Sequence, residues 1–327
     1  MNILFRILLY PFSLLYGILA GLRNKLFDWH ILPSKAVGVP VISVGNISAG
    51  GTGKTPHVEY LANLLKSEYT VGILSRGYRR KTRGFYLVDS NSDATTVGDE
   101  PMQFYQHFKE DAVITAVDEN RVRGCRKLLQ AHPGIGVILL DDAFQHRWIQ
   151  RGLNILISDF FHPYHKDYLL PSGRLREFRS SSKRADIIVI SKSGKVLSPI
   201  TRRTLTEELK PSARQLLCFS YMKYKTPRPL PVVQHTPKWG KTYAILMVTG
   251  IANPYPLEGK IAQECFELHK LKYPDHHKFT PKDARKIKDT FDKIVSVNEI
   301  IITTEKDAMR LSTPEIIKII GHLPIFY

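Results

Sequence analysis

Short apolar runs alternate with amphipathic runs through the first two thirds of the chain. Each apolar or β-branched run is followed by polar or glycine-rich residues, which predicts a β-strand. Apolar residues spaced three or four apart, as at Val58, Leu61 and Leu65, predict helices between the strands. The predicted strands lie at the start of 41–56 and at 71–74, 85–88, 112–115, 136–140, 154–158 and 186–191. This alternation predicts an α/β fold, with a mostly parallel sheet and helices on both faces.

A proline-rich break separates this pattern from a second one. Residues 216–235 are extended and contain Pro227, Pro229 and Pro231, so we expect a linker there, or a pair of strands. Beyond the break, the predicted strands are 243–248 and 300–303, and the predicted helices are 257–265 and 281–297. The sequence therefore predicts an N-terminal segment (1–30), a larger α/β domain (31–215) and a smaller α/β domain (236–327).

Residues 41–56, VISVGNISAGGTGKTP, combine a strand, a glycine-rich loop and a helix N-terminus. Glycines let backbone N–H groups approach an anion, and the first turn of a helix adds unpaired donors and the positive end of a dipole. Lys54 is expected to reach the β- and γ-phosphates of a nucleotide, and the Thr55 hydroxyl to bind Mg²⁺. The predicted nucleotide-binding residues are Gly50, Gly51, Thr52, Gly53, Lys54 and Thr55.

One position departs from the usual phosphate loop, which has glycine where this chain has Ser48. The GGxGK[ST] layout from Gly50 onward is that of a subgroup of phosphate-loop proteins. A glycine-rich hairpin turn is the simpler alternative. It gives no reason for Lys54 and Thr55 to stand directly before an amphipathic helix, so we favour nucleotide binding.

Charged residues follow two other predicted strands. Asp141 and Asp142 come directly after 136–140, where a phosphate-loop enzyme places its second metal-binding element. The basic stretch SRGYRRK follows 71–74, at the strand end where open α/β sheets bind ligands. We expect this stretch to contact an anion, with Arg76 and Tyr78 as candidate substrate-binding residues. A turn aspartate and a solvated loop are the simpler alternatives.

The N-terminal segment holds an uncharged run from Ile7 to Leu22, between Arg6 and Arg23. As a helix the run spans roughly 24 Å, less than the roughly 30 Å hydrocarbon core of a bilayer. A cleaved signal peptide and a buried core helix are alternatives, but a signal peptide would export the phosphate loop away from ATP. We favour a helix embedded in the cytoplasmic face of a membrane, with Arg23 and Lys25 at the lipid phosphates.

The chain is strongly basic, with 47 Lys and Arg against 30 Asp and Glu and a net charge of +17. This excess predicts a negatively charged partner: nucleic acid, a phosphorylated substrate or an anionic membrane. The sequence contains no helix-turn-helix, zinc motif or base-stacking platform, so we expect no nucleic-acid partner and disfavour a DNA-associated ATPase. The three cysteines are far apart and form no CxxC pair, which is typical of a reducing compartment.

Several stretches resemble, in order, the tetraacyldisaccharide 4'-kinases, which are the lipid A 4'-kinases of Gram-negative bacteria. They are VGNISAGGTGKTP, LSRGYRRK, VGDEPMQ, DDAFQHR, LLPSGRLREF, VTGIANP, DHHKFT and TTEKDA, and the resemblance extends to about Arg310. It implies an enzyme that uses ATP and Mg²⁺ to phosphorylate the 4'-hydroxyl of an acylated glucosamine disaccharide 1-phosphate. It also implies a monotopic protein on the cytoplasmic face of the inner membrane, with two α/β domains; we expect a monomer.

The resemblance also implies roles for acidic residues and a histidine. Asp141 and Asp142 resemble the paired acidic residues at the metal. Asp99 in VGDEP, which is also placed to cap a helix, and His276 in DHH resemble a dyad that takes the proton from the acceptor hydroxyl. Without the resemblance, His276 would be read as a surface histidine.

Three further residues gain roles in the same way. Arg176 and Glu177 in GRLRE resemble a pair close to the substrate and the metal, and Arg121 resembles a basic residue near the phosphates. Phosphoryl transfer consists mostly of positioning and charge stabilisation, so a cluster of cations around the γ-phosphate is chemically reasonable.

An alternative function is a nucleotide-switch ATPase or GTPase of the GGxGK[ST] subgroup, with a regulatory role. Those proteins commonly carry lysine just before Gly50, where this chain has Ala49. Loss of ATP that depends on a lipid acceptor would distinguish the kinase from the switch.

Overall fold

The chain folds into two compact units, Met1–Lys223 and Tyr224–Tyr327, each with its own sheet and core. The computed structural model describes residues 3–230, 244–251, 253–275, 277–296 and 298–327. The boundary between the units falls inside the stretch 216–235 that the sequence predicts to be a linker.

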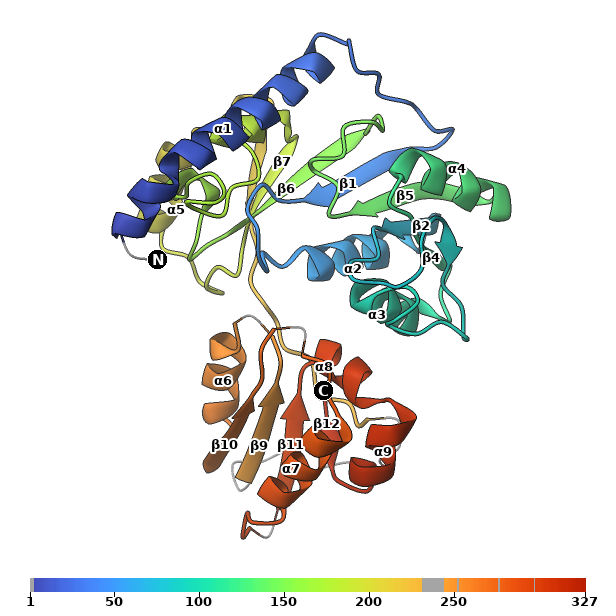
Figure 1. Cartoon of the computed structure of the whole chain (residues 1–327), viewed down its shortest axis with the longest axis vertical. Helices are drawn as coiled ribbons and strands as arrows, with labels where there is room; N and C mark the ends of the chain where they lie inside the picture. Colours follow the sequence, from blue (N-terminus) through green and yellow to red (C-terminus); the bar gives the residue numbers. More distant parts are fainter. Residues whose placement is uncertain (1–2, 231–243, 252, 276, 297) are drawn as a thin grey trace. The chain divides into compact units, whose positions relative to one another are not determined.

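The first unit is built on an eight-stranded sheet with the order β3-β4-β2-β5-β1-β6-β7-β8 (Figure 1). Neighbouring strands are parallel except β3 and β4, which are antiparallel. The strands are β1 (Val41–Gly45), β2 (Thr70–Ser75), β3 (Tyr86–Leu87), β4 (Val113–Val117), β5 (Ile135–Asp141), β6 (Leu153–Asp159), β7 (Ile187–Ser191) and β8 (Leu216–Phe219). The predicted mostly parallel sheet is confirmed.

Helices cover both faces of this sheet because successive side chains of a strand point to opposite faces. On one face, Leu139 of β5 lies in the core formed with α2 (Lys54–Leu65) and α3 (Asp99–Phe108). On the other, Ile138 and Leu140 lie in the core formed with α4 (Arg121–Ala131). On that second face, α5 (Pro199–Leu209) packs against β6 and β7.

Residues 216–219 begin the stretch that we expect to be a linker or a pair of strands. They form β8, which pairs in parallel with β7 at the edge of the first sheet, for example Ile187 with Leu216. The strand is short and only partly buried. Its sequence, LLCF, is apolar but only four residues long, and the proline-rich sequence that follows it makes the whole stretch resemble a connection.

The long helix α1 (Ile3–Asp28) lies along the first unit, beside the yellow-green loops that follow β6 (Figure 1). By length and composition its residues 6–28 could cross a membrane, and only 17% of the most apolar window is buried. Side chains on its outer side are at least half exposed: Ile7, Leu8, Phe12, Leu14, Leu15, Ile18, Leu19 and Leu22. This exposure contradicts the buried-core-helix interpretation.

The inner side of α1 is fixed to the loop at 168–178. Ser13 Oγ donates to the carbonyl of Leu169 (3.1 Å) and accepts from the backbone N–H of Ser172 (3.0 Å). Gly17 lets the helix approach closely, because a Cβ there would lie 2.5 Å from Leu169 and 2.7 Å from Phe178. This loop contains the GRLRE motif, so α1 supports the segment that carries Arg176.

The second unit is a four-stranded parallel sheet with the order β10-β9-β11-β12. Its strands are β9 (Ala244–Thr249), β10 (Glu267–Lys272), β11 (Glu299–Thr303) and β12 (Ile325–Phe326). Its helices are α6 (Tyr255–Ala262), α7 (Pro281–Phe291), α8 (Glu305–Leu311) and α9 (Pro314–Ile320). Residues 228–230 pair with the last strand through hydrogen bonds between Arg228 and Tyr327 and between Leu230 and Ile325.

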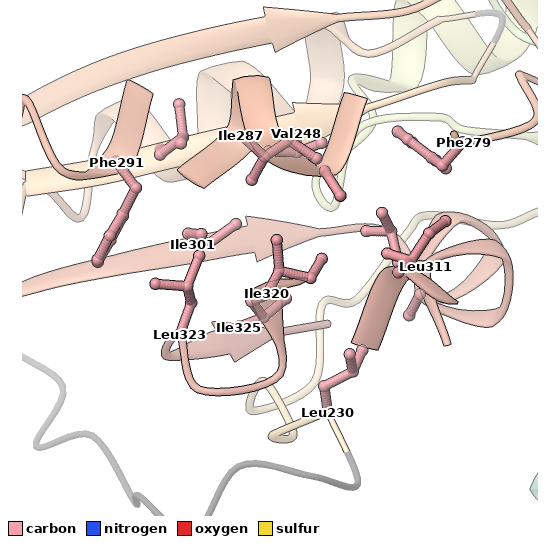
Figure 2. Packing of buried hydrophobic residues seen from close by; sticks show 14 of the residues in the cluster. Leu230, Val248, Phe279, Ile287, Phe291, Ile301, Leu311, Ile320, Leu323 and Ile325 are labelled. Atoms are coloured by element: carbon pink, nitrogen blue, oxygen red, sulfur yellow. The ribbon is translucent and has the colours of Figure 1, made fainter. Parts of the chain in front are cut away.

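Apolar side chains from both helices and strands fill the core of this unit. Figure 2 shows Ile287 and Phe291 of α7, Ile301 of β11 and Ile320 of α9 pointing into one cluster. Two of the recognised motifs also meet here, because the buried Asp307 of TTEKDA accepts from the backbone N–H of Gly250 in VTGIANP (2.9 Å). These motifs therefore join the ends of β9 and β11.

Candidate active site

The glycine-rich loop connects β1 to α2 in the middle of the sheet, where β1 lies between β5 and β6. Gly50 and Gly53 have φ values of 111° and 85°, a conformation that costs glycine little. Gly53 is the N-cap residue of α2, so Lys54 begins the helix. The loop thus delivers a helix N-terminus and its backbone donors to the carboxyl end of the sheet.

Ser48 fits the loop without a glycine. Its φ is not positive, so a side chain at this position causes no backbone strain. The residue is buried and forms an isolated antiparallel bridge with Leu175. Ala49 N–H donates to Arg174 O (2.6 Å) and Arg176 N–H donates to Ile47 O (2.7 Å). The GRLRE segment therefore supports the first half of the phosphate loop.

Two cations meet at Asp142. Lys54 Nζ lies 3.6 Å from Asp142 Oδ1, and Arg176 Nη1 lies 3.2 Å from Asp142 Oδ2. Burial raises the pKa of Asp142, but the charges of Lys54 and Arg176 outweigh this effect and hold the pKa below its usual value. Asp142 is ionised at neutral pH and fixes both cations next to the phosphate loop.

Asp141 lies in different surroundings. Burial, and then the charges of Glu100 and Asp142, raise the pKa of Asp141 to about 7. Ser75 Oγ donates to Asp141 Oδ2 (3.1 Å), whereas Oδ1 is buried without a hydrogen-bond partner. A buried carboxylate oxygen without a partner is costly unless a cation or a proton satisfies it.

Arg121 supports the same strand end. Its guanidinium is buried and donates to the backbone carbonyls of Asp118 (2.5 Å) and Asp141 (3.0 Å). Burial lowers the pKa of Arg121 to about 10, so the side chain stays charged at neutral pH. Arg121, the basic residue predicted to lie near the phosphates, is therefore charged and bound to the backbone of Asp141.

Glu100 is a site residue that sequence reasoning missed. Thr55 Oγ1 donates to Glu100 Oε1 (3.2 Å), which places this carboxylate at the residue predicted to bind Mg²⁺. Its neighbour Asp99 is the first residue of α3, and the N-cap is Gly98, so the predicted capping role of Asp99 is wrong. The sequence signal that could have identified Glu100 was the VGDEP motif, because it places two carboxylates, Asp99 and Glu100, in the first turn of a helix.

The donor set fits a magnesium ion that also binds substrate. Among the residues that the structure describes, no three His, Cys, Asp or Glu side chains form a metal site by themselves. Mg²⁺ usually takes one or two carboxylates together with waters and substrate phosphates. Asp141 with its unpartnered Oδ1, together with the Thr55 hydroxyl, meets this requirement.

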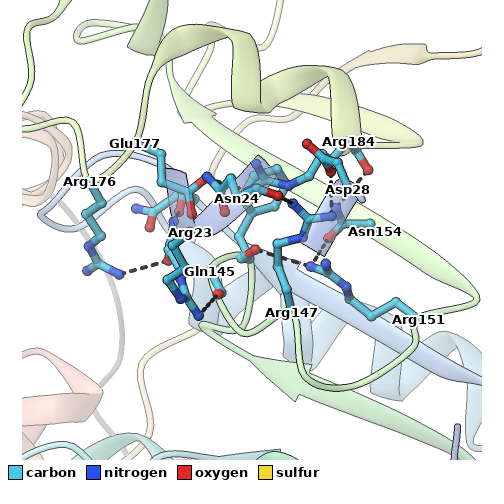
Figure 3. A network of polar contacts seen from close by, with 12 residues as sticks. Arg23, Asn24, Asp28, Gln145, Arg147, Arg151, Asn154, Arg176, Glu177 and Arg184 are labelled. Carbon is cyan, nitrogen blue, oxygen red and sulfur yellow. Dashed lines mark hydrogen bonds and ion pairs between the residues drawn. The ribbon is translucent and has the colours of Figure 1, made fainter. Parts of the chain in front are cut away.

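Glu177 lies in a polar network beneath α1 (Figure 3). Its Oε2 accepts from Arg184 Nη2 (2.5 Å), and the side chain is 3% exposed. Tyr16 of α1 donates to the carbonyl of Arg176 (2.9 Å), and Arg23 donates to the carbonyl of Gln145 (3.1 Å). Glu177 is thus held by an arginine, and its predicted role at the metal stays a prediction.

The remaining predicted residues divide into two groups. Arg76 and Tyr78 are exposed in the loop after β2, where Gly77 and Arg79 have positive φ values of 70° and 61°. They lie at the carboxyl end of the sheet, as predicted. His276 lies outside the described residues.

The comparisons with known proteins point to one family. A family model described as Tetraacyldisaccharide-1-P 4'-kinase matches residues 5–323. The chain is 44% identical over 314 residues to the Tetraacyldisaccharide 4'-kinase of Bacteroides thetaiotaomicron, covering 93% of this chain and 82% of that protein. It is 42% identical over 325 residues to the protein of the same name from Flavobacterium johnsoniae, covering 99% and 93%.

A solved structure gives the same result. The crystal structure of LpxK from Aquifex aeolicus in complex with ATP has a TM-score of 0.74 and 29% sequence identity, covering 98% of this chain and 92% of that one. The nucleotide-switch alternative gains no support from these matches. The chain belongs to the tetraacyldisaccharide-1-P 4'-kinase family.

Proposed function

We propose that this protein transfers the γ-phosphoryl group of ATP to the 4'-hydroxyl of an acylated glucosamine disaccharide 1-phosphate, a step in lipid A biosynthesis. The observation that carries the proposal is the cluster of Lys54, Asp142 and Arg176 at the phosphate loop, in a chain that matches the kinase family nearly end to end. The acceptor oxygen bonds to the γ-phosphorus while the bond from that phosphorus to the ADP oxygen breaks.

The cations stabilise the charge that develops on the transferred group. Lys54, at the first position of α2, reaches the phosphates, and Arg176 and Arg121 add positive charge from two other segments. Because Asp142 holds Lys54 and Arg176 before ATP arrives, little reorganisation is needed during the reaction. The N–H groups at the start of α2 complete the phosphate site.

Mg²⁺ would be held by Asp141 and the Thr55 hydroxyl, with Asp142 and Glu100 adding negative charge nearby. When bound, the ion neutralises phosphate charge and orients the γ-phosphoryl group. Arg184 holds Oε2 of Glu177, and its Oε1 is buried without a hydrogen-bond partner in the described part of the chain. Glu177 therefore stays a candidate residue at the metal.

Asp99 is our candidate for the base that accepts the proton of the 4'-hydroxyl, with His276 as its predicted partner. Arg76 and Tyr78 are candidate contacts to the acceptor. The exposed apolar side of α1 would enter the cytoplasmic leaflet of the inner membrane, where this acceptor lies, and the net charge of +17 would favour anionic lipids. We expect the protein to act as a monomer without nucleic acid.

The test is a transfer assay in detergent micelles, with γ-labelled ATP and the tetraacyl disaccharide 1-phosphate. We expect a labelled lipid whose mass is higher by one phosphoryl group. A matched acceptor with hydrogen in place of the 4'-hydroxyl should gain no label. ATP loss that is equal with both acceptors would contradict the proposal and favour a switch ATPase.

A further inference from the structure

Three consecutive carbonyl groups of the phosphate loop are each bound by a side chain. Lys192 Nζ donates to Gly51 O (2.5 Å), and Ser191 Oγ donates to Thr52 O (2.7 Å). His57 Nδ1 lies 2.7 Å from Gly53 O. A carbonyl can only accept, so Nδ1 carries the proton and Nε2 accepts from Ser220 Oγ (2.9 Å). The three donors to the loop come from the end of β7 and from α2, and Ser220, directly after β8, holds His57.

Lys192 is itself tightly held. Its ammonium lies 2.6 Å from Asp159 Oδ2, and Asp159 Oδ1 accepts from the backbone N–H groups of Phe161 (2.9 Å) and His162 (3.2 Å). Asp159 is the last residue of β6 and pairs in register with Ser191 of β7. Lys192 directly follows β7, and its side chain is held by the last residue of the neighbouring strand β6. The sheet therefore fixes the position of this lysine relative to the loop.

Lys192 also adopts an unfavourable backbone conformation. Its φ is 58°, in the left-handed region that residues with a Cβ rarely occupy. Glycine would adopt this conformation more easily, and the surrounding contacts must compensate for the strain. A lysine at such a position indicates that its side chain, rather than its backbone, is needed there.

The bound carbonyls set the direction of the loop's donors. In a trans peptide the C=O of one residue and the N–H of the next point in opposite directions. Fixing the carbonyls of Thr52 and Gly53 on the β7–β8 side therefore turns the N–H groups of Gly53 and Lys54 away from that side. The peptide held through Gly51 O closes the preceding turn, because its Thr52 N–H donates to Gly50 O (3.0 Å). Successive N–H groups that point the same way form an anion-binding concavity.

We infer that Lys192, held by Asp159 and assisted by Ser191, is a positioning residue that orients the backbone of the phosphate loop toward the β- and γ-phosphates of the nucleotide. This inference rests on the proposed use of ATP, but not on the identity of the acceptor. The lysine acts on the outer side of the loop, through the Gly51 carbonyl, and touches no phosphate itself.

The experiment measures the binding of AMP, ADP and ATP to the full-length protein by calorimetry, without a lipid acceptor. Lys192→Met should weaken ADP and ATP about tenfold, the usual effect of losing one charged hydrogen bond. It should leave AMP within twofold of the parent, since AMP has no β-phosphate for the loop to bind. Lys195→Met, on the same loop but exposed, is the matched control and should change none of the three.

Two more variants separate positioning from folding. Lys192→Gly relieves the strain at φ 58°, so it should fold with a melting temperature close to the parent and still bind ATP weakly. Asp159→Asn should show part of the Lys192→Met effect, and the double variant should bind no worse than Lys192→Met alone, since the two residues act as one unit.

The inference fails if Lys192→Met binds ADP and ATP like the parent. It also fails if AMP weakens as much as ATP, because Lys192 would then contact the nucleoside or the α-phosphate directly. A parent that binds ATP but leaves the disaccharide unphosphorylated would instead overturn the proposed function, and the role of Lys192 in nucleotide binding would stand.

Discussion

Asp141 and Asp142 are adjacent in the sequence but titrate in different ranges. Burial and the nearby Glu100 raise the pKa of Asp141 to about 7, whereas Lys54 and Arg176 hold that of Asp142 below its usual value. Two carboxyl groups whose environments push their pKa values apart can take different roles in one site. Here Asp142 pairs with two cations, whereas Asp141 has an oxygen without a hydrogen-bond partner, which we propose as a ligand for Mg²⁺.

Replacing Lys54 tests the cation at the γ-phosphate. Lys54→Met should lower kcat by about a thousandfold, because a preorganised donor to transition-state charge is lost. The fold should survive, since Arg176 still pairs with Asp142. Lys66→Met is the matched control at the end of the same helix, where Lys66 pairs only with Asp111 among the described acidic residues, and it should keep near-normal turnover. Comparable turnover in the two variants would contradict the assigned role.

Asp141→Asn should remove activity but stabilise the protein without nucleotide and divalent cations. The folded carboxyl keeps its proton up to about pH 7, whereas the unfolded one loses it near 3.8, so stability falls as the pH rises between these values. The asparagine variant avoids this loss. Its melting temperature should exceed that of the parent by a few degrees at pH 8, and by much less at pH 5.

Asp142→Asn is the control for that prediction. The pKa of Asp142 is lowered, so its charge stabilises the fold above the usual carboxyl pKa and loses this effect as the pH falls. The variant should therefore melt below the parent at pH 8. A gain in stability from both variants would contradict the opposite pKa shifts that we assign to Asp141 and Asp142.

At the scale of elements, α1 has two functional sides. Its outer side exposes large apolar residues, and its inner side fixes the loop at 168–178 through Ser13 and Gly17. Tyr16 extends that contact to the carbonyl of Arg176. The helix is therefore both a candidate membrane contact and a support for the GRLRE segment.

Deleting residues 1–22 should release the protein from vesicles while ATP binding remains, because the phosphate loop lies on other elements. The affinity for ATP should fall, since the GRLRE segment that supports the loop loses its contacts with α1. Cosedimentation with anionic vesicles measures the release. If part of the truncated protein stays bound through its basic surface, high salt should detach that part by screening. Salt-resistant binding after the deletion would exclude α1 as the anchor.

Two substitutions separate the sides of α1. Gly17→Val places atoms against Leu169 and Phe178, so it should lower the melting temperature and kcat while vesicle binding persists. Leu8→Gln with Leu15→Gln changes only exposed positions and should weaken vesicle binding with an unchanged melting temperature. The same response from both variants would mean that the two sides are not distinct.

At the scale of the whole molecule, the chain has two compact units, and each is built on its own sheet. We expect two unfolding transitions in calorimetry. Ile301→Ala, in the core of the second unit, should lower one transition by an amount equivalent to about 2–5 kcal/mol. Leu139→Ala should lower the other, and ATP should raise only that one. A single transition that both variants shift would show that the units unfold together.

Substitutions of Asp99 and His276 test whether two residues far apart in the sequence act together as the base. If they form the predicted dyad, Asp99→Ala should lower kcat far more than it raises KM for the lipid, because the base acts in the transition state. His276→Ala should cost less, and the double variant should be little worse than Asp99→Ala. Strictly additive losses would separate the two residues and leave Asp99 as the base alone.

The sequence by itself determined the elements whose signal is local. The phosphate loop could be read because glycines at positive φ, Lys54 and Thr55 occur together in one short stretch. The strands of the first sheet could be read because a sheet buried on both faces needs continuous apolar runs. The exposed edge strand β10 was not predicted, and the edge strand β8 was expected only within a linker or a pair of strands, since an edge position places weaker demands on the sequence.

The tertiary structure decided what depends on distant segments. Glu100 meets Thr55 across 45 positions of sequence, and Lys192 reaches Gly51 across 141. Glu177 is paired with Arg184 by packing that no motif reveals. Burial and charge are sums over everything nearby in space, so a pKa or an ion pair is fixed only when the fold brings those groups together. The sequence was therefore enough to identify the residue types of a phosphate site, whereas the fold determined which ion pairs and hydrogen bonds those residues form.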